Sequence, residues 1–125
     1  MKNLFLTVFV LLFVLSSCKT TEKNVLSSTQ QDYNIDLGDE FTISLKSNST
    51  TGYSWQWVNK QSVEAVDSVD WRYTTLNTNL IGAGGTEKWS FKGIKSGVDT
   101  LKMIYSRPWE AESAVDSVYV IVKVQ

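Results

Sequence analysis

The sequence predicts an all-β protein, an immunoglobulin-like antiparallel β-sandwich of about seven or eight strands. Apolar and polar residues alternate with a period of two in segment after segment, which is typical of strands with one buried face. No segment longer than a turn carries the 3.6-residue period of a helix. Successive segments are spaced by roughly 8 to 15 residues, as in sandwich domains of about 100 residues.

Taken in order, the strands predicted by this alternation begin with a weak candidate at residues 34–37. The clear ones are residues 41–45, 53–57, 69–73, 89–91, 101–105 and 118–124, and residues 62–66 are a second weak candidate. Turns are expected at residues 38–39, 59–60 and 95–97. In the last strand valine recurs at every second position from Val118 to Val124, with Tyr119 and Ile121 between, so we expect burial on most of both faces. A small closed barrel is the alternative architecture.

The N-terminus predicts export. Lys2 precedes an apolar run at residues 4–15, interrupted by Thr7, and Leu15-Ser16-Ser17-Cys18 follows. About 12 helical residues reach only about 18 Å, so a membrane-spanning helix, the alternative, falls short of a hydrocarbon core of about 30 Å. We therefore predict a lipoprotein signal peptide at residues 1–17, lipid attachment at Cys18, a flexible tether through residue 32 and a folded domain at residues 33–125. The expected location is the cell envelope, and the outer membrane is favoured because Lys19, not aspartate, follows the cysteine.

Composition argues against catalysis. The chain has no histidine and a single cysteine, Cys18, which removes the usual nucleophile-histidine pairs and most zinc sites. Glu110 and Glu112 form the one close carboxylate pair near a predicted loop, and we interpret them as solvated charges instead of a glycosidase pair. We expect no enzyme activity, no cofactor and no metal. A formal net charge of −1 without a basic run argues against nucleic acid as a partner, and nothing in the sequence requires more than a monomer.

Three connections are too long for tight hairpins: residues 47–52, 77–86 and 106–114. In a chain that runs up and down, every second connection falls at the same end. If the strands are lettered A to G, these three are the B–C, D–E and F–G connections. The sequence therefore predicts that they cluster at one end of the sandwich as a binding surface.

The three connections also carry motifs. The first contains Asn48-Ser49-Thr50-Thr51-Gly52-Tyr53, the second Gly82-Ala83-Gly84-Gly85 before Trp89-Ser90-Phe91, and the third Arg107-Pro108-Trp109. In this order they resemble the Asn-Pro-Thr-Thr-Gly-Tyr, Gly-x-Gly-Gly and Arg-Pro-Trp loops of the chagasin family, protein inhibitors of papain-like cysteine proteases. The resemblance runs from about Tyr33 to the C-terminus. It departs at Ser49, where the family has proline, and this predicts a first loop that is freer before contact.

The resemblance implies a reversible inhibitor of papain-like cysteine proteases whose three end loops occlude the active-site cleft. It places Thr50 and Thr51 nearest the catalytic cysteine, with the other two loops on the flanks. The implied protease-binding residues are Asn48, Ser49, Thr50, Thr51, Gly52, Tyr53, Gly82, Ala83, Gly84, Gly85, Arg107, Pro108 and Trp109. Trp109 could instead pack under its own loop, and Tyr53 is expected to lie partly in the core. The alternative function is an immunoglobulin-like adhesion or carbohydrate-binding module of a cell-surface lipoprotein.

Overall fold

The computed structural model describes residues 30–76 and 79–125. The predicted signal peptide, Cys18 and the first part of the tether, through residue 29, lie outside the described residues. Within the described ranges, no helix is both long enough and apolar enough to cross a membrane.

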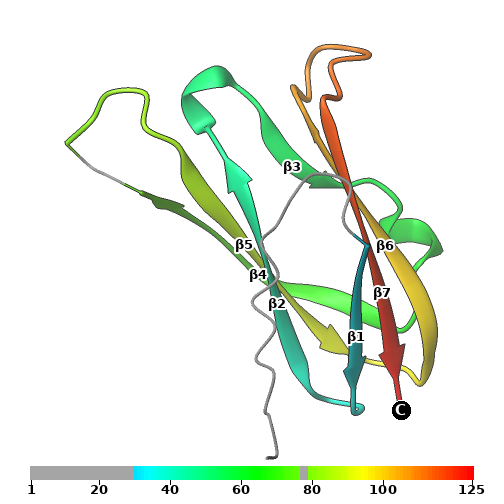
Figure 1. The fold of residues 1–125 in the computed structure, drawn as a ribbon. Coiled ribbons are helices and arrows are strands. Elements are labelled where there is room, and N and C mark those ends of the chain that lie inside the picture. Colours follow the sequence, from blue (N-terminus) through cyan, green and yellow to red (C-terminus); the bar gives the residue numbers. More distant parts are fainter. Residues whose placement is uncertain (1–29, 77–78) are drawn as a thin grey trace, which may run out of the picture.

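Seven strands form two packed sheets, which confirms the predicted sandwich (Figure 1). One sheet has the order β1-β7-β6-β3 and the other β2-β5-β4. Two 3-10 turns, η1 and η2, are the helical elements in the described part of the chain. The bounds are β1 Gln30–Ile35, β2 Glu40–Ser47, η1 Ser49–Thr51, β3 Ser54–Trp57, η2 Lys60–Ser62, β4 Val66–Thr75, β5 Gly85–Gly93, β6 Gly97–Ser106 and β7 Asp116–Val124.

The first strand differs from expectation in two ways. It begins at Gln30, so residues 30–32, predicted as tether, belong to the sheet. Its residues alternate between exposed and half-buried, and Gln31 occupies an inward position, which hides the strand from an analysis of apolar residues. It also pairs in parallel with β7, from Gln30 opposite Tyr119 to Ile35 opposite Val124, whereas the other strand pairs are antiparallel.

The core lies between the two sheets and is filled mostly by the predicted inward positions, with Ala65 and Val66 in addition. It is built from Phe41, Ile43, Leu45, Trp55, Ala65, Val66, Phe91, Leu101, Met103, Val118, Val120, Val122 and Val124. Aromatic contacts join the sheets: the Tyr33 and Phe41 ring centroids lie 4.6 Å apart, and Trp57 meets Phe91 edge-on at 5.2 Å. Because these contacts bridge the layers, they fix how one sheet lies over the other.

Two strand predictions are wrong. Residues 62–65 do not form a strand, because the amides of Glu64 and Ala65 donate to the Asp99 carboxylate, at 2.9 and 2.7 Å, and not to a neighbouring strand; Val66 is the first residue of β4. The last strand, β7, is buried on one face only. Tyr119 on its other face is 44% exposed, since no element of the described chain covers the outer side of this sheet.

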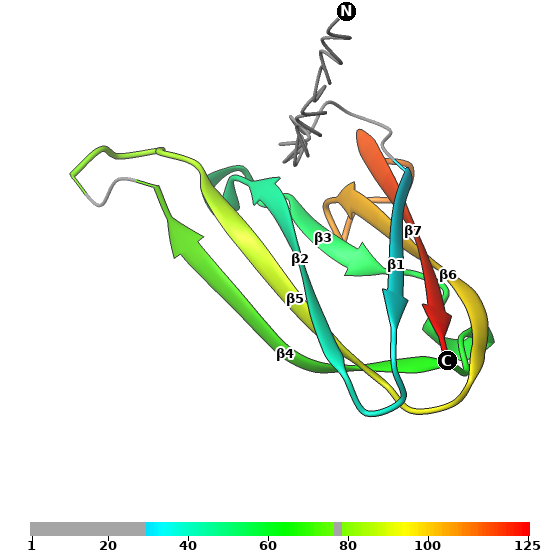
Figure 2. The ribbon, with the colours of Figure 1, turned by 60° about the horizontal axis from the view of Figure 1, so that its bottom comes forward.

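The β4–β5 hairpin is longer than strand β3 of the other sheet. A register shift between Ser68 and Asp70 bends β4, and the hairpin extends beyond the short strand β3 (Figure 2). Trp71, predicted on a buried face, is therefore 51% exposed.

Candidate binding site at the loop end

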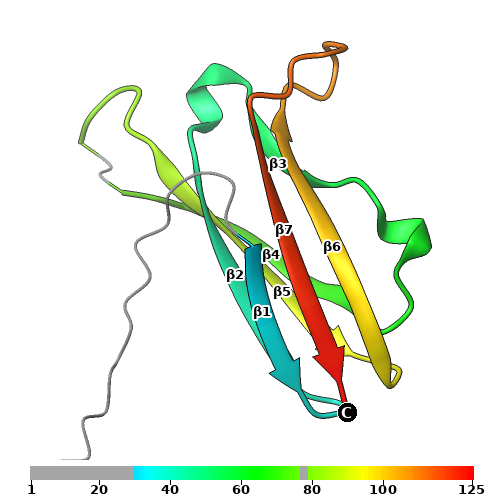
Figure 3. The same cartoon turned by 45° about the vertical axis from the view of Figure 1, so that its right-hand side comes forward.

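The connections β2–β3, β4–β5 and β6–β7 emerge at the same end of the sandwich, opposite the C-terminus (Figures 1 and 3). We call this the loop end. Its described parts are the first loop (residues 48–53), the second loop (residues 79–84) and the third loop (residues 107–115). The predicted clustering of the three connections is thus present in the structure.

The first loop is held by its own hydrogen bonds. The Asn48 side chain caps η1: its Oδ1 accepts from the Thr50 amide at 3.2 Å and from the Thr50 hydroxyl at 2.6 Å. The Thr51 hydroxyl donates to the Asn48 carbonyl at 2.7 Å. Gly52 ends the turn with φ +79°, a conformation that favours glycine. The threonines are therefore displayed at the surface on a shaped turn, although the proline of the family motif is absent.

Hydrogen bonds also join the loops to one another. The Asn48 amide nitrogen Nδ2 donates to the Gly82 carbonyl at 3.2 Å, which ties the first loop to the second. Arg107 Nε donates to the Thr51 carbonyl at 3.2 Å, which ties the third loop to the first. The Arg107 guanidinium lies 4.7 Å from the centroid of the Tyr53 ring, a cation–π contact. The three loops thus form one connected surface.

Trp109 lies on this surface and is not packed under its own loop. Its side chain is 72% exposed. The ring crosses Gly52 so closely that a Cβ at Gly52 would lie 2.6 Å from the ring atom Cη2. Gly52 therefore serves both the turn of the first loop and the position of an aromatic side chain from the third.

The glycines of the second motif play different parts. Gly82 turns the chain with φ +79° and has open space where a Cβ would be. Gly85 is buried at the start of β5, where a Cβ would collide with the Thr74 carbonyl. The structure therefore brings Gly82, Ala83 and Gly84 to the loop end and places Gly85 in the strand packing beneath it.

Sequence reasoning missed two features of this end. Leu80 and Ile81 are exposed apolar residues on the second loop, and their adjacency in an otherwise polar, glycine-rich segment was an available signal. Ser113 holds the base of the third loop: its hydroxyl accepts from the Arg107 amide at 2.9 Å and donates to the Arg107 carbonyl at 3.0 Å. Nothing in the sequence pattern points to this role of Ser113.

The carboxylates of the third loop have ordinary surface roles. Glu110 pairs with Arg107 at 3.2 Å, and its side chain is about half exposed, at 53%. Glu112 is exposed and adopts φ 60° at the turn. In residues 30–76 and 79–125, no group of three or more His, Cys, Asp or Glu side chains is arranged to hold a metal ion.

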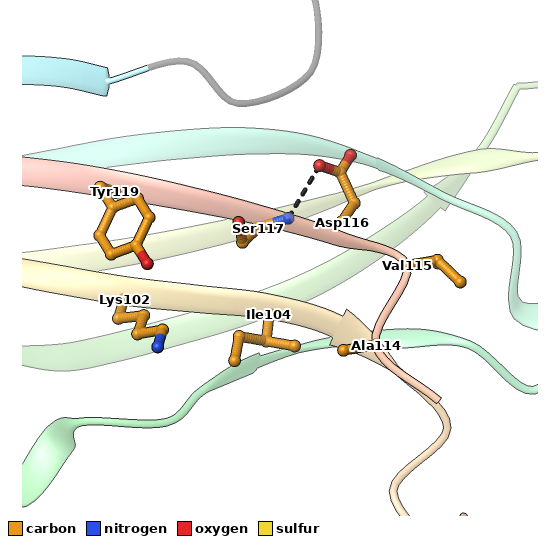
Figure 4. Close-up of a pocket in the computed structure, with 7 residues that line it drawn as sticks. All are labelled: Lys102, Ile104, Ala114, Val115, Asp116, Ser117 and Tyr119. Atoms are coloured by element: carbon orange, nitrogen blue, oxygen red, sulfur yellow. Dashed lines mark hydrogen bonds between the residues drawn. The ribbon is translucent and has the colours of Figure 1, made fainter. Parts of the chain in front are cut away.

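A shallow hollow of about 480 Å³ lies elsewhere, on the outer face of β6 and β7 (Figure 4). It is lined by Lys102, Ile104, Ala114, Val115, Asp116, Ser117 and Tyr119. The motif residues take no part in it. The three loops instead project from the sandwich beyond its strands (Figures 1 and 3).

The fold and the loop end define an immunoglobulin-like binding protein that presents three linked loops at one end. The chain belongs to the chagasin family of peptidase inhibitors, whose model matches residues 34–124. Chagasin of Trypanosoma cruzi is 31% identical over 80 residues, which cover 62% of this chain and 73% of that protein. The family consists of inhibitors of cysteine proteases, so the chain is an inhibitor and not an enzyme.

Solved structures share the fold. Leishmania mexicana ICP is 30% identical, with a TM-score of 0.56, and the match covers 82% of this chain and 96% of that one. PbICP-C, solved in complex with falcipain-2, has a TM-score of 0.52 at 19% identity and covers 82% of this chain and 95% of its own. At that identity the second likeness shows the fold alone.

Proposed function

We propose that the loop end reversibly occludes the active-site cleft of a papain-like cysteine protease without being cut. The observation that carries the proposal is the pair of hydrogen bonds from Asn48 to Gly82 and from Arg107 to Thr51, which makes three loops into one wedge before any partner is present. Such preorganisation lowers the ordering cost of binding. PbICP-C, which has the same fold, binds falcipain-2.

In this proposal the first loop enters the groove. Thr50 and Thr51 are exposed, short and uncharged, so they fit a narrow cleft at small entropic cost. Trp109 beside them supplies a rigid aromatic anchor, and the second loop contacts the opposite flank with its backbone.

Titration of papain with the full chain, purified in detergent, tests the proposal. We expect stoichiometric loss of activity that returns on dilution, with the inhibitor chain intact on a gel. Undiminished papain activity at micromolar excess would reject it. Binding on a glycan array without inhibition would instead support the carbohydrate-binding alternative.

We propose further that the chain is exported and held in the cell envelope, in the outer membrane, by lipid at Cys18. The sequence of residues 1–18 supports this. The first residue of β1, Gln30, lies opposite Tyr119, near the start of β7 and therefore in the half of the sandwich that carries the loop end. A lipid anchor on the preceding segment would keep the loop end close to the membrane. Replacing Cys18 with serine should move the protein from the membrane fraction to the soluble one, and an unchanged distribution would reject the anchor.

We also propose that the protein is a monomer. Sedimentation of the serine variant should give a monomer.

A further inference from the structure

A buried carboxylate lies beneath the first loop. Glu87 on β5 is only 2% exposed and has a place among the inward-facing core residues. No ion pair found among the described residues includes it. Burying a charge without a counter-ion is costly unless hydrogen bonds replace its water.

Four donors replace that water. Glu87 Oε1 accepts from the Ser47 hydroxyl at 2.7 Å and from the Trp55 amide at 3.1 Å. Its Oε2 accepts from the indole nitrogens of Trp71 at 3.1 Å and Trp89 at 3.3 Å. An ionised carboxylate only accepts hydrogen bonds, and this set of four donors matches that capacity.

The two donors on Oε1 lie on either side of the first loop. Ser47 is the last residue of β2, and Trp55 is the second residue of β3. These strands belong to different sheets, so no ladder of backbone hydrogen bonds joins them. Glu87 Oε1 therefore closes the base of the loop across the gap between the sheets.

Resting on the proposed function, we propose that Glu87 is a positioning residue for inhibition: it sets the first loop in the shape that enters the protease cleft. Stability alone gives no reason for a charge here, because a well-packed apolar residue in place of a buried ionic group is often as stable or more so. An apolar side chain could not join the Ser47 hydroxyl to the Trp55 amide.

Two matched variants test this. Ser47→Ala and Trp71→Phe each remove one donor from the same carboxylate, but only Ser47 flanks the loop. We expect Ser47→Ala to weaken papain inhibition about tenfold, the scale of one hydrogen bond to a charged group, and Trp71→Phe to change it less than about twofold. Amide hydrogen exchange at Thr51 and Gly52 should accelerate in the first variant and stay unchanged in the second. Equal effects of the two variants on exchange, or no effect of either, would overturn the proposal.

Glu87→Gln sharpens the test. With one oxygen kept on Ser47 and Trp55, the new amide group would face two indole donors with its own hydrogens. We expect at least about tenfold weaker inhibition and faster exchange in the loop. Wild-type inhibition by this variant, with unchanged exchange, would overturn the proposal. If this variant does not fold, the comparison of Ser47→Ala with Trp71→Phe tests the proposal. If the wild-type chain does not inhibit papain, the proposed function fails, while the exchange comparison still judges the role of Glu87.

Discussion

The two ends of the sandwich use the same backbone device for different purposes. Gly38, in the turn between β1 and β2 at the far end, has φ +90° and open space where a Cβ would lie. Gly52, in the first loop, has φ +79° and the ring of Trp109 in that space. At the far end the glycine only lets the chain turn, whereas at the loop end it also admits a side chain from another loop. The loop end is therefore built as a joint surface, and its residues should act together.

The largest effect is expected from Gly52→Ala. A non-glycine residue in the left-handed region costs about 1–2 kcal/mol of folding free energy. Displacing Trp109 removes an interface contact worth about 2 kcal/mol of binding free energy. Loss of the Trp109 anchor and distortion of the turn that displays Thr50 and Thr51 should together weaken papain inhibition on the order of 100-fold or more. Gly38→Ala is the matched control, because it carries similar strain with no neighbour to displace. Denaturant unfolding should show similar losses of stability, while inhibition constants separate the two. Equal inhibition by both variants would contradict a joint surface.

Trp109→Ala is expected to have the second-largest effect on inhibition. Its ring is mostly exposed, so the free energy of unfolding should change little. Inhibition should fall by about 2 kcal/mol, roughly 30-fold, because large aromatic side chains dominate interface energetics. Tyr119→Ala removes an exposed aromatic from the outer face of β7 and should leave the inhibition constant unchanged. A weak effect of Trp109→Ala, no larger than that of the control, would remove Trp109 from the interface.

Arg107→Lys probes the link between the third and first loops. Lysine keeps the charge but loses the planar group that lies over Tyr53 and the Nε bond to the Thr51 carbonyl. Looser loops must be ordered on binding, so inhibition should weaken by about 1 kcal/mol, near fivefold. Arg72→Lys makes the same change in an exposed pair with Asp70 on β4 and is expected to have no effect. A titration of both variants against papain makes the comparison, and identical curves would mean that the link is unimportant.

The sequence predicted the sandwich and the shared end of the three loops because both follow from strand alternation and chain direction. It did not predict how the loops are joined. The bond from Asn48 to Gly82 spans residues far apart in the chain and depends on a side-chain rotamer. Glu87 lies in the strand that follows the second motif, and its charge gives no sign of burial; the packing of the two sheets encloses it.

The exposure of side chains also depends on which elements pack over a strand, and the alternation of residues along the strand does not contain this information. The alternation around Trp71 predicts a buried face, but β3 is too short to cover that part of the hairpin. The valines of β7 are buried as expected, while Tyr119 between them faces outward because the sheet has one covered side. A period of two identifies the strand, and the second layer determines how much of each face is buried.

Ser49→Pro carries the smallest expected effect and the opposite sign. Ser49 is the first residue of η1, a position whose amide has no intrahelical acceptor and which proline favours. The preceding Asn48 adopts φ −133° and ψ 96°, an extended conformation close to the one that a following proline favours. Because the Asn48 cap already shapes the turn, proline should lower the cost of ordering the free loop on binding by no more than about 1 kcal/mol, and inhibition should tighten at most about fivefold. Ser96→Pro, in the turn before β6 at the far end, controls for effects of proline away from the loop end and should leave inhibition unchanged. Weaker inhibition by Ser49→Pro, measured against papain beside this control, would show that the first loop must change shape on binding.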